Sequence, residues 1–188
     1  MKKTVVSILS VLLVAALACM AVACNNNDPT PDGMQNVTTA DSAAFYNLYV
    51  PLSWSSQASG GISGARVSDT DRSNVTVTMY FPDETQTPEG YWDSQCLPSY
   101  NQVFTNVTVD AENCKDVTLG GKNAKQYVFT YQMDGADYKV MQVIGVHNEI
   151  VYTLTFTAVA TAAGATAAQS YDNHLATVET IVSCFTFA

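Results

Sequence analysis

Three consecutive β-strands in the second half of the chain constrain its fold more than any other feature. They are expected at Ala124–Met133, Tyr138–His147 and Ile150–Ala158. In the first and third, large apolar side chains alternate with other residues, which is the period of a strand that buries one face. Asp134-Gly135 separates the first two strands and His147-Asn148-Glu149 the next two, and an Asp-Gly pair between such runs is typical of a tight hairpin. The sequence therefore predicts an antiparallel meander that other elements must cover.

Two helices are expected to provide that cover. The first begins at Thr87, which serves as N-cap, with Pro88 at the first helical position and Glu89 in the first turn. Pro98 should kink or split this helix, because proline has no backbone N–H to donate. The second is capped by Ser170, and its apolar residues recur at i, i+4, i+7 and i+11, so that one face can pack on the sheet.

The remaining strands complete an α+β domain. The predicted fold is a three-layer α/β/α sandwich with a mostly antiparallel sheet, the three-strand meander and a helix on each face. The further strands are expected at Phe45–Val50, Asn74–Phe81, Phe104–Val109 and Ser183–Phe187, with loops at Gln57–Gly64, Asp110–Lys122 and Ala158–Gln169.

The first 23 residues are typical of a lipoprotein signal peptide. A basic start precedes the apolar run Val5–Ala18, which is too short for a mature transmembrane helix. Ala21-Val22-Ala23-Cys24 resembles the bacterial lipobox, in which the cysteine becomes the first mature residue and carries a diacylglycerol. Cys19 is a competing site, but cleavage there would leave apolar residues in the mature tether. The alternative is an ordinary secretory signal peptide cut near Ala23.

This interpretation divides the chain into three parts and sets its location. Residues 1–23 are the signal peptide, 24–40 a polar flexible tether and 41–188 a single folded domain. Acyl chains on Cys24 would hold the exported protein on the membrane surface. Removing Lys2 and Lys3 from the eight basic residues leaves six against 17 acidic ones, a net charge of −11. Such a charge excludes electrostatic binding to nucleic acid, which needs clustered lysine and arginine.

The cysteines of the domain indicate no metal or redox centre. Cys96, Cys114 and Cys184 allow at most one disulfide, for which Cys96 and Cys114 are the candidates, and Cys184 is expected as a small buried residue. The chain has no Cys-x-x-Cys motif or Cys/His cluster, so neither a zinc site nor any other cofactor is expected.

Four segments together resemble the PsbP-like fold. They are Val50-Pro51-Leu52-Ser53-Trp54, Gly120-Gly121-Lys122-Asn123-Ala124, Tyr152-Thr153-Leu154-Thr155-Phe156 and Ile181-Val182-Ser183-Cys184-Phe185-Thr186-Phe187. This fold occurs in the extrinsic photosystem protein PsbP, in a nuclear Ran-binding protein and in bacterial lipoproteins. The resemblance implies a binding or assembly module without a catalytic motif.

Two patterns in the sequence were weighed as catalytic or metal sites. A nucleophile-and-base enzyme needs a histidine, but His147 is expected in a hairpin turn and His174 on the polar face of a helix, both in solvent. Asp69–Asn74 places oxygen ligands at alternate positions, as a calcium loop does. It lacks the glycine and the bidentate glutamate, so a solvated turn is favoured and weak calcium binding is the alternative.

A candidate ligand surface is formed by Tyr91 and Trp92 with Glu89 and Asp93 beside them. Such acids could serve in glycoside cleavage, and the aromatic rings could stack on a sugar, whereas in the simpler interpretation Trp92 packs on the sheet. The sequence thus favours a non-enzymatic, membrane-anchored module with an unidentified protein or small-molecule partner. The alternatives are a glycan-directed hydrolase and a calcium-dependent binding module.

Overall fold

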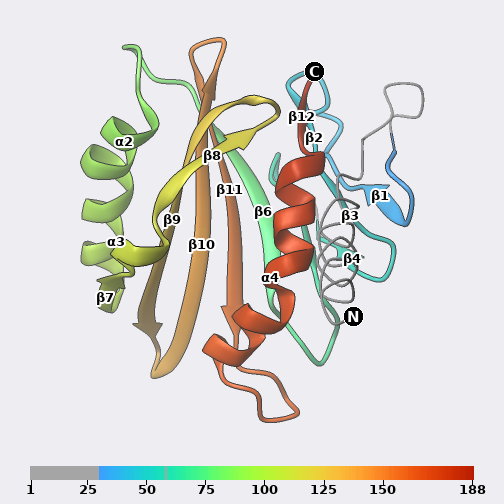
Figure 1. Cartoon of the computed structure of the whole chain (residues 1–188), viewed down its shortest axis with the longest axis vertical. Coiled ribbons are helices and arrows are strands. Elements are labelled where there is room, and N and C mark those ends of the chain that lie inside the picture. The colour runs from blue at the N-terminus through green and yellow to red at the C-terminus, as the bar shows by residue number, and fades with distance from the viewer. Residues whose placement is uncertain (1–29, 58) are drawn as a thin grey trace, which may run out of the picture.

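A computed structural model describes residues 30–57 and 59–188, and its centre is one large β-sheet (Figure 1). Within these residues the sheet has eight strands in the order β4-β5-β6-β11-β10-β9-β7, and β8 also pairs with β9. Two small sheets, β1 with β3 and β2 with β12, lie outside it. Every strand pair among these residues is antiparallel, which confirms the α+β class with a mostly antiparallel sheet.

In chain order the elements are β1 (Met34–Asn36), β2 (Tyr46–Asn47), β3 (Tyr49–Pro51), β4 (Ser55–Ser56), β5 (Ser63–Arg66), β6 (Asn74–Tyr80), α2 (Pro88–Tyr91), the π-helix η1 (Trp92–Cys96), α3 (Leu97–Val103), β7 (Thr105–Val109), the 3-10 helix η2 (Ala111–Asn113), β8 (Lys115–Leu119), β9 (Lys122–Met133), β10 (Ala136–His147), β11 (Ile150–Val159), α4 (Ala167–Cys184) and β12 (Thr186–Phe187).

The predicted meander is confirmed as β9, β10 and β11. Both of its turns are two-residue loops in which both residues have positive φ: 53° and 78° at Asp134 and Gly135, and 49° and 65° at Asn148 and Glu149. Loops of this kind match the right-handed twist of the flanking strands, so they set the register without splaying the pair. Glycine or asparagine occupies one position of each turn, where the left-handed conformation costs least.

Alternate residues of the meander supply two separate apolar clusters. Val128 and Met141 belong to a cluster that also contains Val178 and Ile181 of α4. Phe129, which follows Val128, belongs to the second cluster, together with the side chains of η1. Successive side chains of a strand point to opposite faces, so the two clusters lie on opposite faces of the sheet.

The first helical segment runs through Pro98 by changing its hydrogen-bond period. Thr87 caps α2, its hydroxyl accepting a bond from the Gly90 N–H, as the sequence predicted. The backbone then widens into η1, where the Leu97 N–H bonds the Trp92 carbonyl five residues back. Pro98 thus falls in the first turn of α3, where a missing N–H costs least. The π-helical turn thus divides the segment into three helical pieces, α2, η1 and α3.

Several of the expected boundaries were wrong. The strand predicted at Phe45–Val50 is divided into β2 and β3, which pair with different partners. The loop predicted at Gln57–Gly64 overlaps the start of β5 at Ser63, and the loop predicted at Asp110–Lys122 contains β8. Both short strands carry little alternation. Thr166, not Ser170, caps α4, through a capping box with Gln169. The same helix continues to Cys184, which leaves only Thr186–Phe187 of the predicted final strand.

The folded part also begins earlier than the sequence suggested. Met34–Asn36, placed in the tether, forms β1 and pairs with Tyr49–Pro51. Val37 follows it and is buried in the cluster under α4. A single apolar residue among polar ones gave no periodic signal, so only its tertiary partners identify this strand.

Gly120 and Gly121 provide a matched test of the β8–β9 turn. Both have positive φ, 54° and 74°, so alanine at either should cost about 1–2 kcal/mol of unfolding free energy. Only Gly120 also faces an obstacle, since a Cβ there would lie 2.5 Å from the Phe187 ring, whereas at Gly121 nothing lies within 4 Å. We therefore expect Gly120→Ala to destabilise the domain by about 1–3 kcal/mol more than Gly121→Ala in urea denaturation. Equal losses would show that β12 does not hold Phe187 against this turn.

Candidate functional site

The four residues of the predicted ligand surface lie at the α2–η1 junction, but at different depths. Trp92 is 3% exposed, and its ring stacks on Tyr127 with a centroid distance of 4.1 Å and an interplanar angle of 6°. Trp92 therefore supports the surface from below. Glu89 and Asp93 are open to solvent, and Tyr91 is half-buried between them.

Tyr91 connects this helix to the open part of the sheet. Its ring stacks on Tyr80 of β6 at 5.3 Å, and Tyr80 is 41% exposed. Partial burial raises the pKa of Tyr91 to about 12, so its hydroxyl is protonated at physiological pH. The pair thus presents two aromatic rings with polar ends.

Glu89 borders a hollow of about 480 Å³ between α2 and the β8–β9 hairpin. The Lys125 Nζ lies 2.8 Å from the Asp116 carboxylate and 3.7 Å from that of Glu89. The hydrogen bond to Asp116 raises the pKa of Lys125, so this amine stays charged and is unsuited to proton transfer near neutral pH. The arrangement suits binding a polar group better than catalysis. The lining consists of Thr87, Pro88, Glu89, Asp116, Val117, Asn123 and Ala124.

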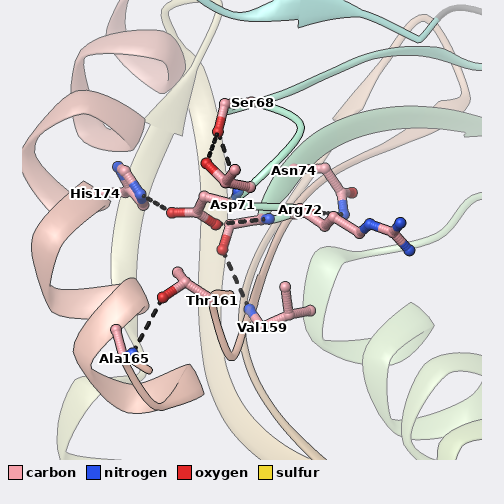
Figure 2. A network of polar contacts seen from close by, with 10 residues as sticks. Ser68, Asp71, Arg72, Asn74, Val159, Thr161, Ala165 and His174 are labelled. Carbon is pink, nitrogen blue, oxygen red and sulfur yellow. Dashed lines mark hydrogen bonds and ion pairs between the residues drawn. The ribbon is translucent and has the colours of Figure 1, made fainter. Parts of the chain in front are cut away.

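A second polar cluster joins α4 to the β5–β6 turn, and Figure 2 shows it from close by. The His174 Nε2 lies 2.7 Å from the Asp71 Oδ2, and the two side chains are only 20% and 15% exposed. The His174 ring also meets Trp54 edge-on, with centroids 6.1 Å apart. The prediction that His174 lies in solvent was wrong, because the β5–β6 turn folds over this side of α4.

The Asp71 carboxylate is held by bonds from two directions. Its Oδ1 accepts the Ser73 N–H at 3.0 Å, while the Ser73 hydroxyl accepts the Val159 N–H at the end of β11 (Figure 2). Burial alone would raise the pKa of Asp71, but the bonds from His174 and Ser73 outweigh burial and hold the pKa below its usual value. Ser68 and Ser73 bond to Asp71 rather than to the imidazole, so the serines of this cluster do not form a nucleophile–histidine pair.

The segment Asp69–Asn74, for which weak calcium binding was the alternative interpretation, has its acidic groups engaged with protein partners. Asp69 pairs with Arg66, and Asp71 pairs with His174. Within residues 30–57 and 59–188, no three metal-ligating side chains are gathered into a group that could hold an ion. The other histidine, His147, is half-buried and stacks on Phe187 at 4.4 Å, which also corrects the expectation of a solvated side chain.

Cys96 and Cys114, the candidates for a disulfide, are both free thiols in the structure. Cys184 is buried, as expected, and Cys96, the last residue of η1, is buried as well, which raises the pKa of its thiol to about 11. The Cys114 thiol donates to the Asp110 carbonyl at 3.3 Å. A thiol held in its protonated form is a poor nucleophile, so Cys96 is suited to packing rather than to reaction.

Cys24 and the signal peptide lie outside the residues that the structure describes. Among the helices of residues 30–57 and 59–188, none combines the length and apolar character needed to cross a bilayer.

Comparison with solved structures identifies the fold. Cyanobacterial PsbP (CyanoP) from Synechocystis sp. PCC 6803 superposes with a TM-score of 0.56 over 83% of this chain and 93% of its own, at 13% identity. LpqN, which is involved in cell envelope biogenesis of Mycobacterium tuberculosis, superposes with a TM-score of 0.53 over 82% of this chain and 90% of its own, at 17% identity. Sequence comparison finds no matching family model and no matching curated protein. The chain thus has a PsbP-like fold, as predicted, and identities this low establish the fold alone.

The Asp71–His174 pair predicts how stability responds to acid. A carboxyl whose pKa is lowered by folding contributes stability above its unfolded-state pKa of about 3.9, and that contribution is lost as pH falls through the folded value. We expect the wild-type domain to lose more unfolding free energy than Asp71→Asn between about pH 5 and pH 2. Urea denaturation at each pH measures this difference.

Asp83→Asn, which alters an exposed loop carboxylate, is the control and should follow the wild type. If Asp71→Asn and Asp83→Asn respond to acid alike, the pair does not contribute in the way proposed.

Proposed function

We propose that this protein is a lipid-anchored, extracytoplasmic binding or assembly module with no catalytic activity of its own. The single observation that carries the proposal is the lipobox ending at Cys24, placed directly before a whole PsbP-like domain. The groups that could have suggested catalysis have other partners: His174 bonds Asp71, and Lys125 pairs with Asp116. LpqN, a protein of the same fold, is described as involved in cell envelope biogenesis, which is compatible with this role.

The anchor follows from the chemistry of Cys24. Each methylene of an acyl chain that enters the bilayer contributes about 0.8 kcal/mol, so a diacylglycerol holds far more firmly than a single chain. The tether would then extend from Cys24 to Gly33, because β1 begins at Met34. A net charge of −11 for the mature chain makes adhesion to anionic headgroups unfavourable, so the lipid rather than the protein surface would hold it.

We further propose a ligand surface around the α2–η1 junction. Tyr91, Glu89 and Asp93 would meet the ligand, and Trp92 would fix their position by stacking on Tyr127. The domain as a whole would be a three-layer sandwich in which the α2–α3 segment and α4 are the outer layers. The two apolar clusters on opposite faces of the sheet support this description.

The anchor has a direct test with a matched control. Cys24→Ala should move the protein from the membrane fraction to the soluble extracytoplasmic fraction and remove the fatty acid from the mature amino terminus, as measured by mass spectrometry. Cys19→Ala, which removes the competing site, should leave both unchanged. Continued membrane attachment of Cys24→Ala, or release of Cys19→Ala, would contradict the proposed lipidation site.

A further inference from the structure

One half of a sheet face carries a regular array of threonines. Val75 and Val77 of β6 and Leu154 and Phe156 of β11 belong to the cluster under α4. The residues between and beside them therefore point to the opposite face. We call those that are not buried the threonine face: Arg66, Asn74, Thr76, Thr78, Tyr80, Thr155 and Thr157. Thr153, which pairs with Thr78 and points to the same side, is buried.

The register aligns these side chains in rows across three strands. Arg66 pairs with Asn74, which pairs with Thr157, and in the next row Thr76 pairs with Thr155. Along β6, from Asn74 to Tyr80, the face extends roughly 20 Å, and its three strands span about 10 Å. The result is a long, shallow surface rather than a pocket.

The helical segment on this side of the sheet meets the threonine face at Tyr80, which stacks on Tyr91. Within the described residues, the cluster that contains Trp92 draws on β9, β10 and β11 but on no residue of β5 or β6. Thr78 is exposed, and Thr76, Thr155 and Thr157 are half-buried. An antiparallel sheet normally buries one face and exposes polar groups on the other. Here a single face is divided, so that one half is covered by the helical segment and the other half is exposed.

The hydroxyl of Thr155 is oriented by Gln142, its cross-strand partner on β10, on the same face of the sheet. Gln142, which is 2% exposed, donates through Nε2 to the Thr155 Oγ1 at 3.1 Å and to the Tyr100 hydroxyl at 2.7 Å. Because the Thr155 oxygen already accepts a bond, its own proton is available to a partner outside. A buried amide thus fixes one donor of the array before any ligand arrives.

Aromatic rings close one end of the threonine face. Tyr80 is its last residue on β6, and Tyr91 stacks on Tyr80. The array therefore runs from hydroxyl groups to a pair of tyrosines, a combination that offers hydrogen bonds to hydroxyls and a flat apolar surface to a ring.

The charge of the threonine face differs from that of the chain. The full sequence has a formal net charge of −9, yet no aspartate or glutamate belongs to the face, and Arg66 is paired with Asp69. An anionic polymer would be repelled by the acidic surroundings, and a cationic one would find no carboxylate on the face itself. The surface matches an uncharged ligand that is rich in hydroxyl groups.

We propose that the threonine face binds an uncharged, extended polysaccharide, with sugar hydroxyls on Thr76, Thr78 and Thr155 and one sugar ring on the Tyr80–Tyr91 pair. This inference rests on the proposed binding function and adds a ligand class to it. It includes Tyr91 of the α2–η1 surface but places the main contacts on β6 and β11.

The test uses the full-length chain purified in detergent, with N-acetylchitohexaose and cellohexaose as uncharged probes and polygalacturonate as an anionic one. Titration calorimetry should show binding of at least one hexasaccharide, and weaker or no binding of polygalacturonate. Thr78→Ala/Thr155→Ala and Tyr80→Ala should each weaken binding at least tenfold. The control Thr85→Ala/Thr118→Ala, which alters exposed threonines elsewhere, should stay within twofold of the wild type.

Several outcomes would overturn the inference. They are no binding of either hexasaccharide, equal losses in the threonine-face and control variants, or tighter binding of polygalacturonate. Thermal unfolding of each variant separates loss of contact from loss of fold. Binding that is lost in Lys125→Met but kept in Thr78→Ala/Thr155→Ala would place the ligand in the hollow beside Glu89, which would preserve the proposed binding function and reject the threonine face.

Discussion

The antiparallel ladder between β10 and β11 is the interaction on which the rest of the structure depends. It pairs Tyr138 with Val159 at one end and His147 with Ile150 at the other. Residues 140–145 of β10 are buried on both faces, so this strand lies at the centre of the protein. Both apolar clusters include its side chains, and each helical segment packs against one of these clusters. Because β10 is buried on both sides, its side chains contribute to both hydrophobic cores.

Unequal cover of this sheet produces the surfaces that could bind a partner. The long strands extend beyond the short α2–α3 segment, so the side chains of β5 and β6 on that face remain open. The type of residue changes at that boundary. The aromatic side chains of Tyr127 and Phe129 lie under the helical segment, while the polar Thr76 and Thr78 lie beyond it. The same boundary brings Tyr91 and Tyr80 together. The proposed binding surfaces therefore lie where a hydrophobic core ends.

Prediction from sequence succeeded where periodicity and turn chemistry were strong, and failed where they were weak. The meander and its Asp134-Gly135 turn were found because long alternating runs carry their own signal. β8 was missed because its five residues are mostly polar, and it exists because β9 is long enough to pair with a second strand. Likewise, the amphipathic pattern identified α4 but not its first residue. The helix begins after the Thr166–Gln169 capping box, whereas the sequence pattern favoured Ser170 as the cap.

The sequence by itself determined the class of fold and the antiparallel meander, because each depends on residues that are neighbours in the chain, and the proposed export signal rests on the sequence alone. Tertiary structure alone decided that His174 meets Asp71, 103 positions away, and it decided between the two interpretations of Trp92 in favour of packing on the sheet. It also decided which threonines share an open face, since that depends on where a helix on another segment ends. The physical reason is that periodicity assigns a side chain to a face, whereas only packing determines what covers that face.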